Sequence, residues 1–185
     1  MDDQQSLRAF FAKEAYSKDP IRSYKGYNLV SDPNDPFTKV YRSDIDKKQI
    51  VAIRGTEGFK DMLLDAQLGL GKSVRSSDRY KRSEEMYKRH FDPRYNTEFA
   101  AHSLGGAIGN ELAKRFGTNA SLFNPYLSRE GIASGSTVIK TSDDPLQRVN
   151  ALFGKTSDLG DARKVINIGP SGGNLLQAHS IESFQ

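Results

Sequence analysis

Short apolar runs alternate along this chain with longer segments in which apolar residues recur every three or four positions. The runs are rich in Val, Ile and Phe and end at polar or glycine residues, which is typical of buried strands. They lie at residues 37–41, 49–53, 97–101, 121–123, 137–139 and 164–168. We predict a strand at each run, with a turn at residues 46–48 between the first two.

Two of the longer segments have the apolar spacing of amphipathic helices. The first is expected to begin at Ser6 as its N-cap and to place the apolar residues of 7–15 on one face. The second covers residues 107–116, and Gly117 supplies its stop. Because strands and helices alternate, the sequence predicts an α/β fold with a mostly parallel central sheet flanked by helices. No repeat or linker interrupts the pattern, so residues 1–185 are expected to form a single domain.

The formal net charge of +4 is concentrated in residues 72–94, where eight Lys or Arg accompany four Asp or Glu. Such a stretch can contact anionic lipid headgroups or nucleic acid. The acids interleave with the bases, however, while Tyr80, Tyr87 and Phe91 supply a modest apolar face, which favours a solvated helix. We expect at most a transient contact with a membrane surface and no specific nucleic-acid partner. The sequence predicts no particular oligomeric state.

The bulk composition is that of a polar globular protein, with 36% hydrophobic residues and a mean hydropathy of −0.63. No apolar run approaches the roughly 20 residues that span a bilayer. Residues 1–5 lack the basic and apolar regions of a signal peptide, and there is no cysteine. These features exclude disulfides and thiol catalysis, and they lead us to expect a cytoplasmic location.

The most informative residue for chemistry is Ser103, which lies between a predicted strand and a predicted helix. A sharp turn at this point lifts the hydroxyl off the sheet and aims the backbone N–H of Leu104 at a reacting carbonyl. The turn is cramped, so the residues two positions before and after the serine must be small; they are Ala101 and Gly105. Ser103 is therefore a candidate nucleophile, the alternative being an ordinary serine at a helix start.

A serine nucleophile needs a base, and the chain has three histidines. His102 is adjacent to Ser103 and cannot bend round to its hydroxyl. His90 precedes the serine on the basic segment. His179 is therefore the candidate base, and the supporting acid is expected between Ser103 and His179, the order found in α/β hydrolases.

Two acids, Asp143 and Asp144, follow the predicted strand at 137–139. An acid at this place holds the imidazole in the required tautomer and stabilises its protonated form. We select Asp144 and leave Asp143 open, with Asp158 and Asp161 as more distant alternatives. The second oxyanion donor is expected after an earlier strand, at the backbone N–H of Thr56.

Several segments together resemble the class 3 lipases, which are fungal-lipase-like α/β hydrolases. They are residues 50–56 with Asp61 and Asp65 downstream, 101–107, 123–125, 144–146 and 178–180, and residues 15–16 are similar to the family's N-terminal helix. The resemblance implies a compact α/β-hydrolase fold and a carboxylic ester hydrolase acting on acylglycerols or phospholipids. It also implies Ser103 as nucleophile, Asp144 as acid, His179 as base, and an oxyanion hole at Thr56 and Leu104.

The chain departs from the secreted members of that family in three ways. Ala101 stands where the family has the first glycine of the turn around the serine, the chain contains no cysteine, and we expect no signal peptide. The stretch between Thr56 and Ser103 is short, and residues 68–80, a candidate lid, are rich in Gly, Ser and Arg rather than apolar. These departures argue against long-chain triglycerides as substrates and indicate a compact intracellular or virus-encoded member.

The sequence predicts a cofactor-independent serine lipase or esterase. Residues 71–73 end like a phosphate-binding loop, but the position of its first glycine holds Ala66, and residues 32–46 lack the spacing of a calcium loop. We expect no cofactor and no metal. The alternatives are a hydrolase-like fold used as a non-catalytic module that binds lipid or nucleic acid, and an enzyme that passes the acyl group to an acceptor other than water.

Overall fold

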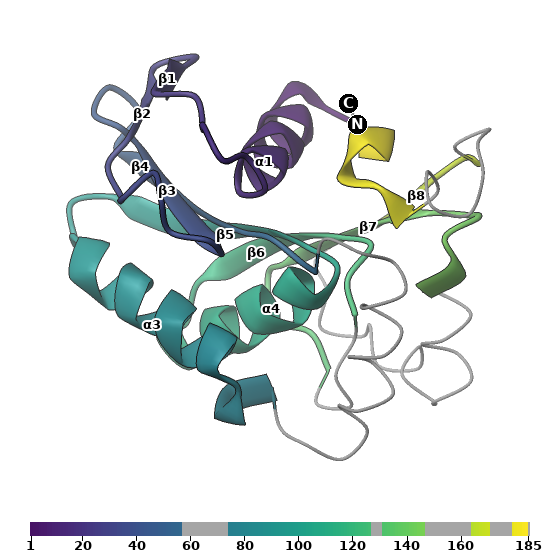
Figure 1. Ribbon diagram of the computed structural model, residues 1–185. Helices are drawn as coiled ribbons and strands as arrows, with labels where there is room; N and C mark the ends of the chain where they lie inside the picture. Colours follow the sequence, from purple (N-terminus) through teal and green to yellow (C-terminus); the bar gives the residue numbers. More distant parts are fainter. Residues whose placement is uncertain (57–73, 127–130, 147–163, 171–178, 185) are drawn as a thin grey trace.

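The computed structural model describes residues 1–56, 74–126, 131–146, 164–170 and 179–184. Within these residues, a central sheet of eight strands follows the order of the sequence (Figure 1). The first four strands pair antiparallel, and β4 to β8 pair parallel. The strands are β1 (Ser23–Tyr24), β2 (Tyr27–Leu29), β3 (Thr38–Ser43), β4 (Lys48–Ile53), β5 (Asn96–His102), β6 (Asn119–Phe123), β7 (Thr137–Thr141) and β8 (Lys164–Ile168).

Helices cover both faces of this sheet (Figure 1). On one face lies α1 (Asp3–Glu14), which contacts the short 3₁₀ helix η2 (Ile181–Phe184). On the other face lie α3 (Asp78–His90) and α4 (Leu104–Phe116), with the 3₁₀ helix η1 (Val74–Ser76) beside α4. The predicted fold class, an α/β fold with a mostly parallel sheet flanked by helices, is confirmed.

Successive residues of the central strands enter opposite cores, because side chains alternate across a strand. In β4, Val51 and Ile53 pack with α3 and α4, whereas Ile50 and Ala52 pack with α1. Burial of both faces explains why these strands are continuous apolar runs rather than alternating ones. At about 1.5–3 kcal/mol for each large buried side chain, these two cores supply the main stabilisation of the sheet.

The first helix begins earlier than the sequence predicted. Asp2 is its N-cap, since its Oδ1 accepts a hydrogen bond from the N–H of Gln5 (2.8 Å), and the predicted cap, Ser6, lies inside the helix. An aspartate at the cap, followed by Asp3 in the first turn, suits the positive end of the helix dipole. The predicted end of α4 is confirmed, because Gly117 takes the left-handed conformation (φ +64°).

The bases of the charged segment are largely paired with acids. Lys88 pairs with Glu84 and Arg82 with Asp35, while Lys81–Asp78, Arg75–Glu111 and Arg94–Asp92 are further pairs. Tyr80 and Tyr87 are buried as predicted, but Phe91 is 54% exposed, so its assignment to the inner face is wrong. The helix ends at His90, and Phe91 follows it as an extended C-cap residue whose ring lies at the rim of that face, 5.7 Å from the ring of Tyr87.

In the part of the chain that the structure describes, no helix has the length and apolar character needed to traverse a bilayer.

Candidate active site

Ser103 lies at the junction of β5 and α4 in a strained backbone conformation, with φ +57° and ψ −125°. Such a conformation is rare for a residue with a side chain and persists only when its surroundings hold it. The N–H of Ser103 donates to the carbonyl of Phe123 (3.1 Å), and the carbonyl of Ser103 accepts from Gly106 and Tyr126 (both 2.9 Å). Its hydroxyl makes no capping hydrogen bond to α4, so Ser103 is not an ordinary helix cap.

The residues around this turn are small because the neighbouring backbone is close. A Cβ atom added at Gly105 would lie 2.5 Å from the carbonyl oxygens of Ile53 and Arg54. The methyl group of Ala101 fits because it faces Gly109, where an added Cβ would approach it to 2.9 Å. Ala101 is absent from the described residues with positive φ, so its backbone conformation does not require glycine.

We expect Gly105→Ala to destabilise the protein by about 3 kcal/mol, because the added methyl must displace backbone at the end of β4. Gly169→Ala is the matched control, since no atom of the described residues lies within 4 Å of a Cβ atom built there. Urea denaturation of both variants measures the difference. Equal midpoints for Gly105→Ala and the wild type would show that the turn tolerates a side chain.

Ser103, His179 and Asp144 form a continuous hydrogen-bonded group. Ser103 Oγ lies 2.9 Å from His179 Nε2, and His179 Nδ1 lies 2.8 Å from Asp144 Oδ1. Because a carboxylate accepts, Nδ1–H donates to Asp144 and the bare Nε2 accepts from the Ser103 hydroxyl. All three are buried, with 1%, 7% and 1% of their surfaces exposed. They come from the ends of β5 and β7 and from the residues before η2.

Asp144, rather than Asp143, is the acid that contacts His179. Its Oδ1 also accepts the N–H of Leu146 (3.0 Å), which fixes the carboxylate at the end of β7. The more distant alternatives, Asp158 and Asp161, lie outside the described residues.

The loop at residues 54–56 lies directly against Ser103 through Gly55. A Cβ atom at Gly55 would be 2.7 Å from Ser103 Cβ. The guanidinium of Arg79 donates to the carbonyls of Arg54 (2.9 Å) and Gly55 (3.0 Å) and to Thr56 Oγ1 (3.3 Å). Because β4 and β5 are parallel neighbours, the residues that follow them, including Thr56 and Leu104, emerge at the same edge of the sheet.

Asn124, whose contribution was not predicted, joins the ends of β6 and β7 through its side chain. Its Oδ1 accepts the N–H of Thr141 (2.9 Å), and its Nδ2 donates to Thr141 Oγ1 (3.1 Å). Asn124 has a positive φ of 39°, which asparagine tolerates better than most residues. The sequence places an Asn-Pro pair directly after a predicted strand. The pair was noted only as part of the family resemblance, and no structural contribution was predicted for it.

His102 was also set aside, because it cannot reach the Ser103 hydroxyl. Its ring nitrogens instead contact Tyr16 Oη (2.7 Å, from Nδ1) and the carbonyl of His179 (2.8 Å, from Nε2). Burial, followed by the nearby charge of His179, holds the pKa of His102 well below its usual value. The imidazole is therefore neutral at physiological pH.

This neutral imidazole predicts an acid-dependent loss of stability. Since the folded pKa of His102 is below the unfolded value of about 6.5, the unfolded state binds more protons as the pH falls below that value. The contribution to stability is complete above pH ~6.5 and is lost on acidification, at up to about 1.4 kcal/mol per pH unit.

We expect His102→Gln to flatten the dependence of unfolding free energy on pH below about 6.5. Urea titrations of the wild type and the variant at several pH values measure the slopes. Burial also lowers the pKa of His90, but that contribution is common to both proteins. Parallel curves for the two would contradict the assignment to His102.

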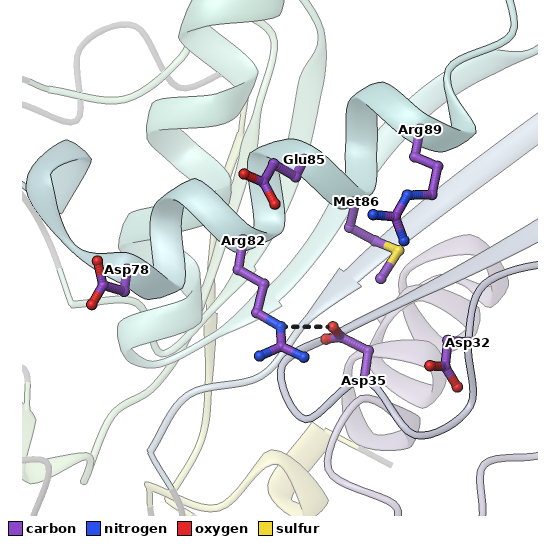
Figure 2. Close-up of a pocket in the computed structure, with 7 residues that line it drawn as sticks. All are labelled: Asp32, Asp35, Asp78, Arg82, Glu85, Met86 and Arg89. Atoms are coloured by element: carbon purple, nitrogen blue, oxygen red, sulfur yellow. Dashed lines mark hydrogen bonds and ion pairs between the residues drawn. The ribbon is translucent and has the colours of Figure 1, made fainter.

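A pocket of about 360 Å³ lies between α3 and the loop before β3 (Figure 2). It is lined by Asp32, Asp35, Asp78, Arg82, Glu85, Met86 and Arg89, and Arg82 reaches across it to pair with Asp35 (3.1 Å). None of the residues grouped around Ser103 lines it. Although four acids surround the pocket, the described residues contain no group of three side chains arranged to hold a metal ion.

A family model described as a Tle-like phospholipase domain, of the phospholipase-like family, matches residues 9–153. No curated protein matches the chain by sequence.

Among solved structures, the fold is similar to three fungal lipases. The triacylglycerol lipase from Penicillium expansum is 15% identical with a TM-score of 0.52, over 94% of this chain and 80% of that one. The Rhizomucor miehei lipase in its propeptide complex is 13% identical with a TM-score of 0.52, over 81% and 64%. The Lip2 lipase from Yarrowia lipolytica is 16% identical with a TM-score of 0.50, over 80% and 76%. At such identities the likeness concerns the fold.

Proposed function

The chain belongs to the phospholipase-like family as a Tle-like phospholipase domain, and on this premise we propose that it is a serine hydrolase of lipid carboxylic esters. Ser103 is the nucleophile, His179 the base and Asp144 the acid. The observation that carries the proposal is the unbroken hydrogen-bonded series from Ser103 Oγ through His179 to Asp144. The strained backbone of Ser103 supports it, because strain of this kind concentrates at functional sites.

The first half of the reaction forms an acyl-enzyme. His179 Nε2 takes the proton of Ser103 as Oγ attacks the ester carbonyl. Asp144 keeps the other proton on Nδ1 and stabilises the imidazolium that results. The carbonyl oxygen becomes an oxyanion, which accepts hydrogen bonds from the backbone N–H groups of Thr56 and Leu104. When the intermediate collapses, His179 returns its proton to the leaving alcohol.

The second half releases the acid. A water molecule gives a proton to His179 and attacks the acyl carbonyl of Ser103, and the same two N–H groups stabilise the second oxyanion. Collapse then breaks the bond between the acyl carbon and Ser103 Oγ, and His179 returns its proton to Oγ, which restores the hydroxyl. Each step uses protons and electron pairs from the protein, the ester and water alone.

Phospholipids and acylglycerols are the substrate classes that we propose for this site, within a single unit of residues 1–185. The candidate lid at 68–80 lies only partly in the described chain: residues 74–76 form η1, residues 78–80 begin α3, and residues 68–73 lie outside it. Contact with a membrane surface through residues 72–94 is supported weakly, because several bases there are already paired with acids.

Turnover of p-nitrophenyl esters with acyl chains from two to sixteen carbons, run beside fluorophosphonate labelling, tests the proposed function. We expect turnover and covalent labelling at Ser103. A maximum at short chains would indicate an esterase with a shallow site, and a maximum at long chains a lipase. Labelling without turnover would favour acyl transfer to another acceptor. Absence of both would overturn the proposal in favour of a non-catalytic binding module.

A further inference from the structure

Three hydrogen bonds join the loop at residues 54–56 to the backbone of His179. Gly55 N lies 2.7 Å from Tyr16 Oη, Tyr16 Oη lies 2.7 Å from His102 Nδ1, and His102 Nε2 lies 2.8 Å from the carbonyl oxygen of His179. The series therefore begins beside the proposed oxyanion hole and ends at the proposed base. It passes through two side chains to which the reaction above assigns no step.

The direction of every bond in this series follows from its ends. A backbone N–H only donates, so Tyr16 Oη accepts from Gly55; a carbonyl only accepts, so His102 Nε2–H donates to His179. A neutral imidazole carries one N–H, which leaves Nδ1 to accept the hydroxyl proton of Tyr16. Burial lowers the pKa of His102 and so maintains this neutral form. Each donor in the series therefore faces an acceptor.

We propose that Tyr16 and His102 are positioning residues that couple the backbone of Gly55 to the backbone of His179, and so keep the oxyanion donor at Thr56 and the base at a constant separation. The inference rests on the proposed function of Ser103, His179 and Thr56.

The packing around the series supports a positioning role. Tyr16 follows the end of α1, where its N–H donates to the carbonyl of Lys13 (2.9 Å). An added Cβ atom at Gly55 would lie 2.8 Å from Tyr16 Oη and 2.7 Å from Ser103 Cβ, so the loop is confined between them. The rings of His102 and His179 are also close, with centroids 5.0 Å apart. A shift at Tyr16 is therefore transmitted to the loop and to the base.

Loss of this coupling lowers kcat, because oxyanion donors act on the transition state and small displacements of reacting groups are costly. We expect Tyr16→Phe to reduce kcat for a short p-nitrophenyl ester by about 10- to 100-fold while KM changes less than about twofold. Tyr41→Phe is the matched control. Its buried hydroxyl has no hydrogen-bond partner among the described residues, and it lies in the core beneath α1.

His102 variants provide a graded comparison. His102→Gln keeps a side-chain N–H that can donate to the carbonyl of His179, whereas His102→Leu keeps only the bulk. We expect kcat to fall in the order wild type, His102→Gln, His102→Leu. Both variants lose the imidazole, so the difference between them reports the hydrogen bond to the carbonyl of His179. Equal activity of the two variants would indicate that His102 acts only by filling space.

A second readout, by NMR spectroscopy, does not depend on activity. The chain has only three histidines, so each imidazole can be assigned. Long-range ¹H–¹⁵N correlation spectra assign the tautomer of each imidazole. We expect His102 to be the neutral Nε2–H form at physiological pH, and Tyr16→Phe to shift its Nδ1 resonance while Tyr41→Phe leaves it in place.

The two readouts separate failure of this inference from failure of the proposed function. An Nδ1–H tautomer at His102, or wild-type kcat in Tyr16→Phe, overturns the positioning role even if Ser103→Ala is inactive. A wild type without serine-dependent turnover overturns the proposed hydrolase function. In that case the tautomer of His102 and its response to Tyr16→Phe still test whether the hydrogen bonds from Gly55 to His179 are coupled.

Discussion

Replacing Ser103 with alanine is expected to lower kcat for ester hydrolysis by about 10⁴-fold or more, and to abolish fluorophosphonate labelling. The variant removes the only atom that can form the acyl-enzyme in the proposed mechanism. His179→Ala should lose a similar factor, because Ser103 Oγ then has no base at 2.9 Å. The double variant should be scarcely worse than either single one, since the two residues act as a unit.

Steady-state kinetics and intact-mass spectrometry after labelling measure these losses. Ser121→Ala, which removes a buried hydroxyl from β6, is the matched control and should retain wild-type kcat. Circular dichroism establishes that each variant is folded. If His179→Ala kept most of the activity, the assignment of the base would be wrong, whereas labelling of Ser103→Ala would place the nucleophile elsewhere.

The second large effect is expected at Asp144. Asp144→Asn should lower kcat by about 10³- to 10⁴-fold while leaving the shape of the site intact. The amide carries no charge to stabilise the imidazolium, and its NH₂ group can donate to Nδ1, which favours the wrong tautomer of His179. Part of the loss should be recovered at higher pH, where hydroxide replaces water as the attacking species.

Asp143→Asn is the matched control for this prediction, because it makes the same chemical change one residue away. The contact between His179 Nδ1 and Asp144 Oδ1 predicts that Asp143→Asn stays within about threefold of the wild type. Profiles of kcat against pH for both variants distinguish the two acids. Equal losses in the two variants would show that the negative charge of this turn matters, rather than the specific hydrogen bond to His179.

The strands of the parallel half were predictable because their signal is local. A run of apolar residues indicates a strand that is buried on both faces, as in β4, which was predicted at residues 49–53 and is observed at Lys48–Ile53. The strand β8 was predicted with its observed bounds, Lys164–Ile168, although its residues are exposed or half-buried. The end of α4 at Gly117 was equally local, since the left-handed conformation there favours glycine.

Other features of the fold gave no such signal. The hairpin of β1 and β2 escaped prediction because strands of two and three residues are too short to show a period. The start of α1 was misplaced because both Asp2 and Ser6 are good caps, and local chemistry did not choose between them.

The kinds of residue at the candidate site and their order can be read from the sequence: a serine between small residues after one strand, an acid after a later strand, and one histidine downstream. Which atoms come into contact depends on the tertiary structure. In the folded chain, Asp144 contacts His179 and Ala101 packs against Gly109. Tyr16 likewise contacts His102, although the two residues are 86 positions apart in the chain. Local patterns reflect the backbone's own preferences, whereas contacts between distant residues depend on how α1 and the sheet pack together, and no short segment encodes that packing.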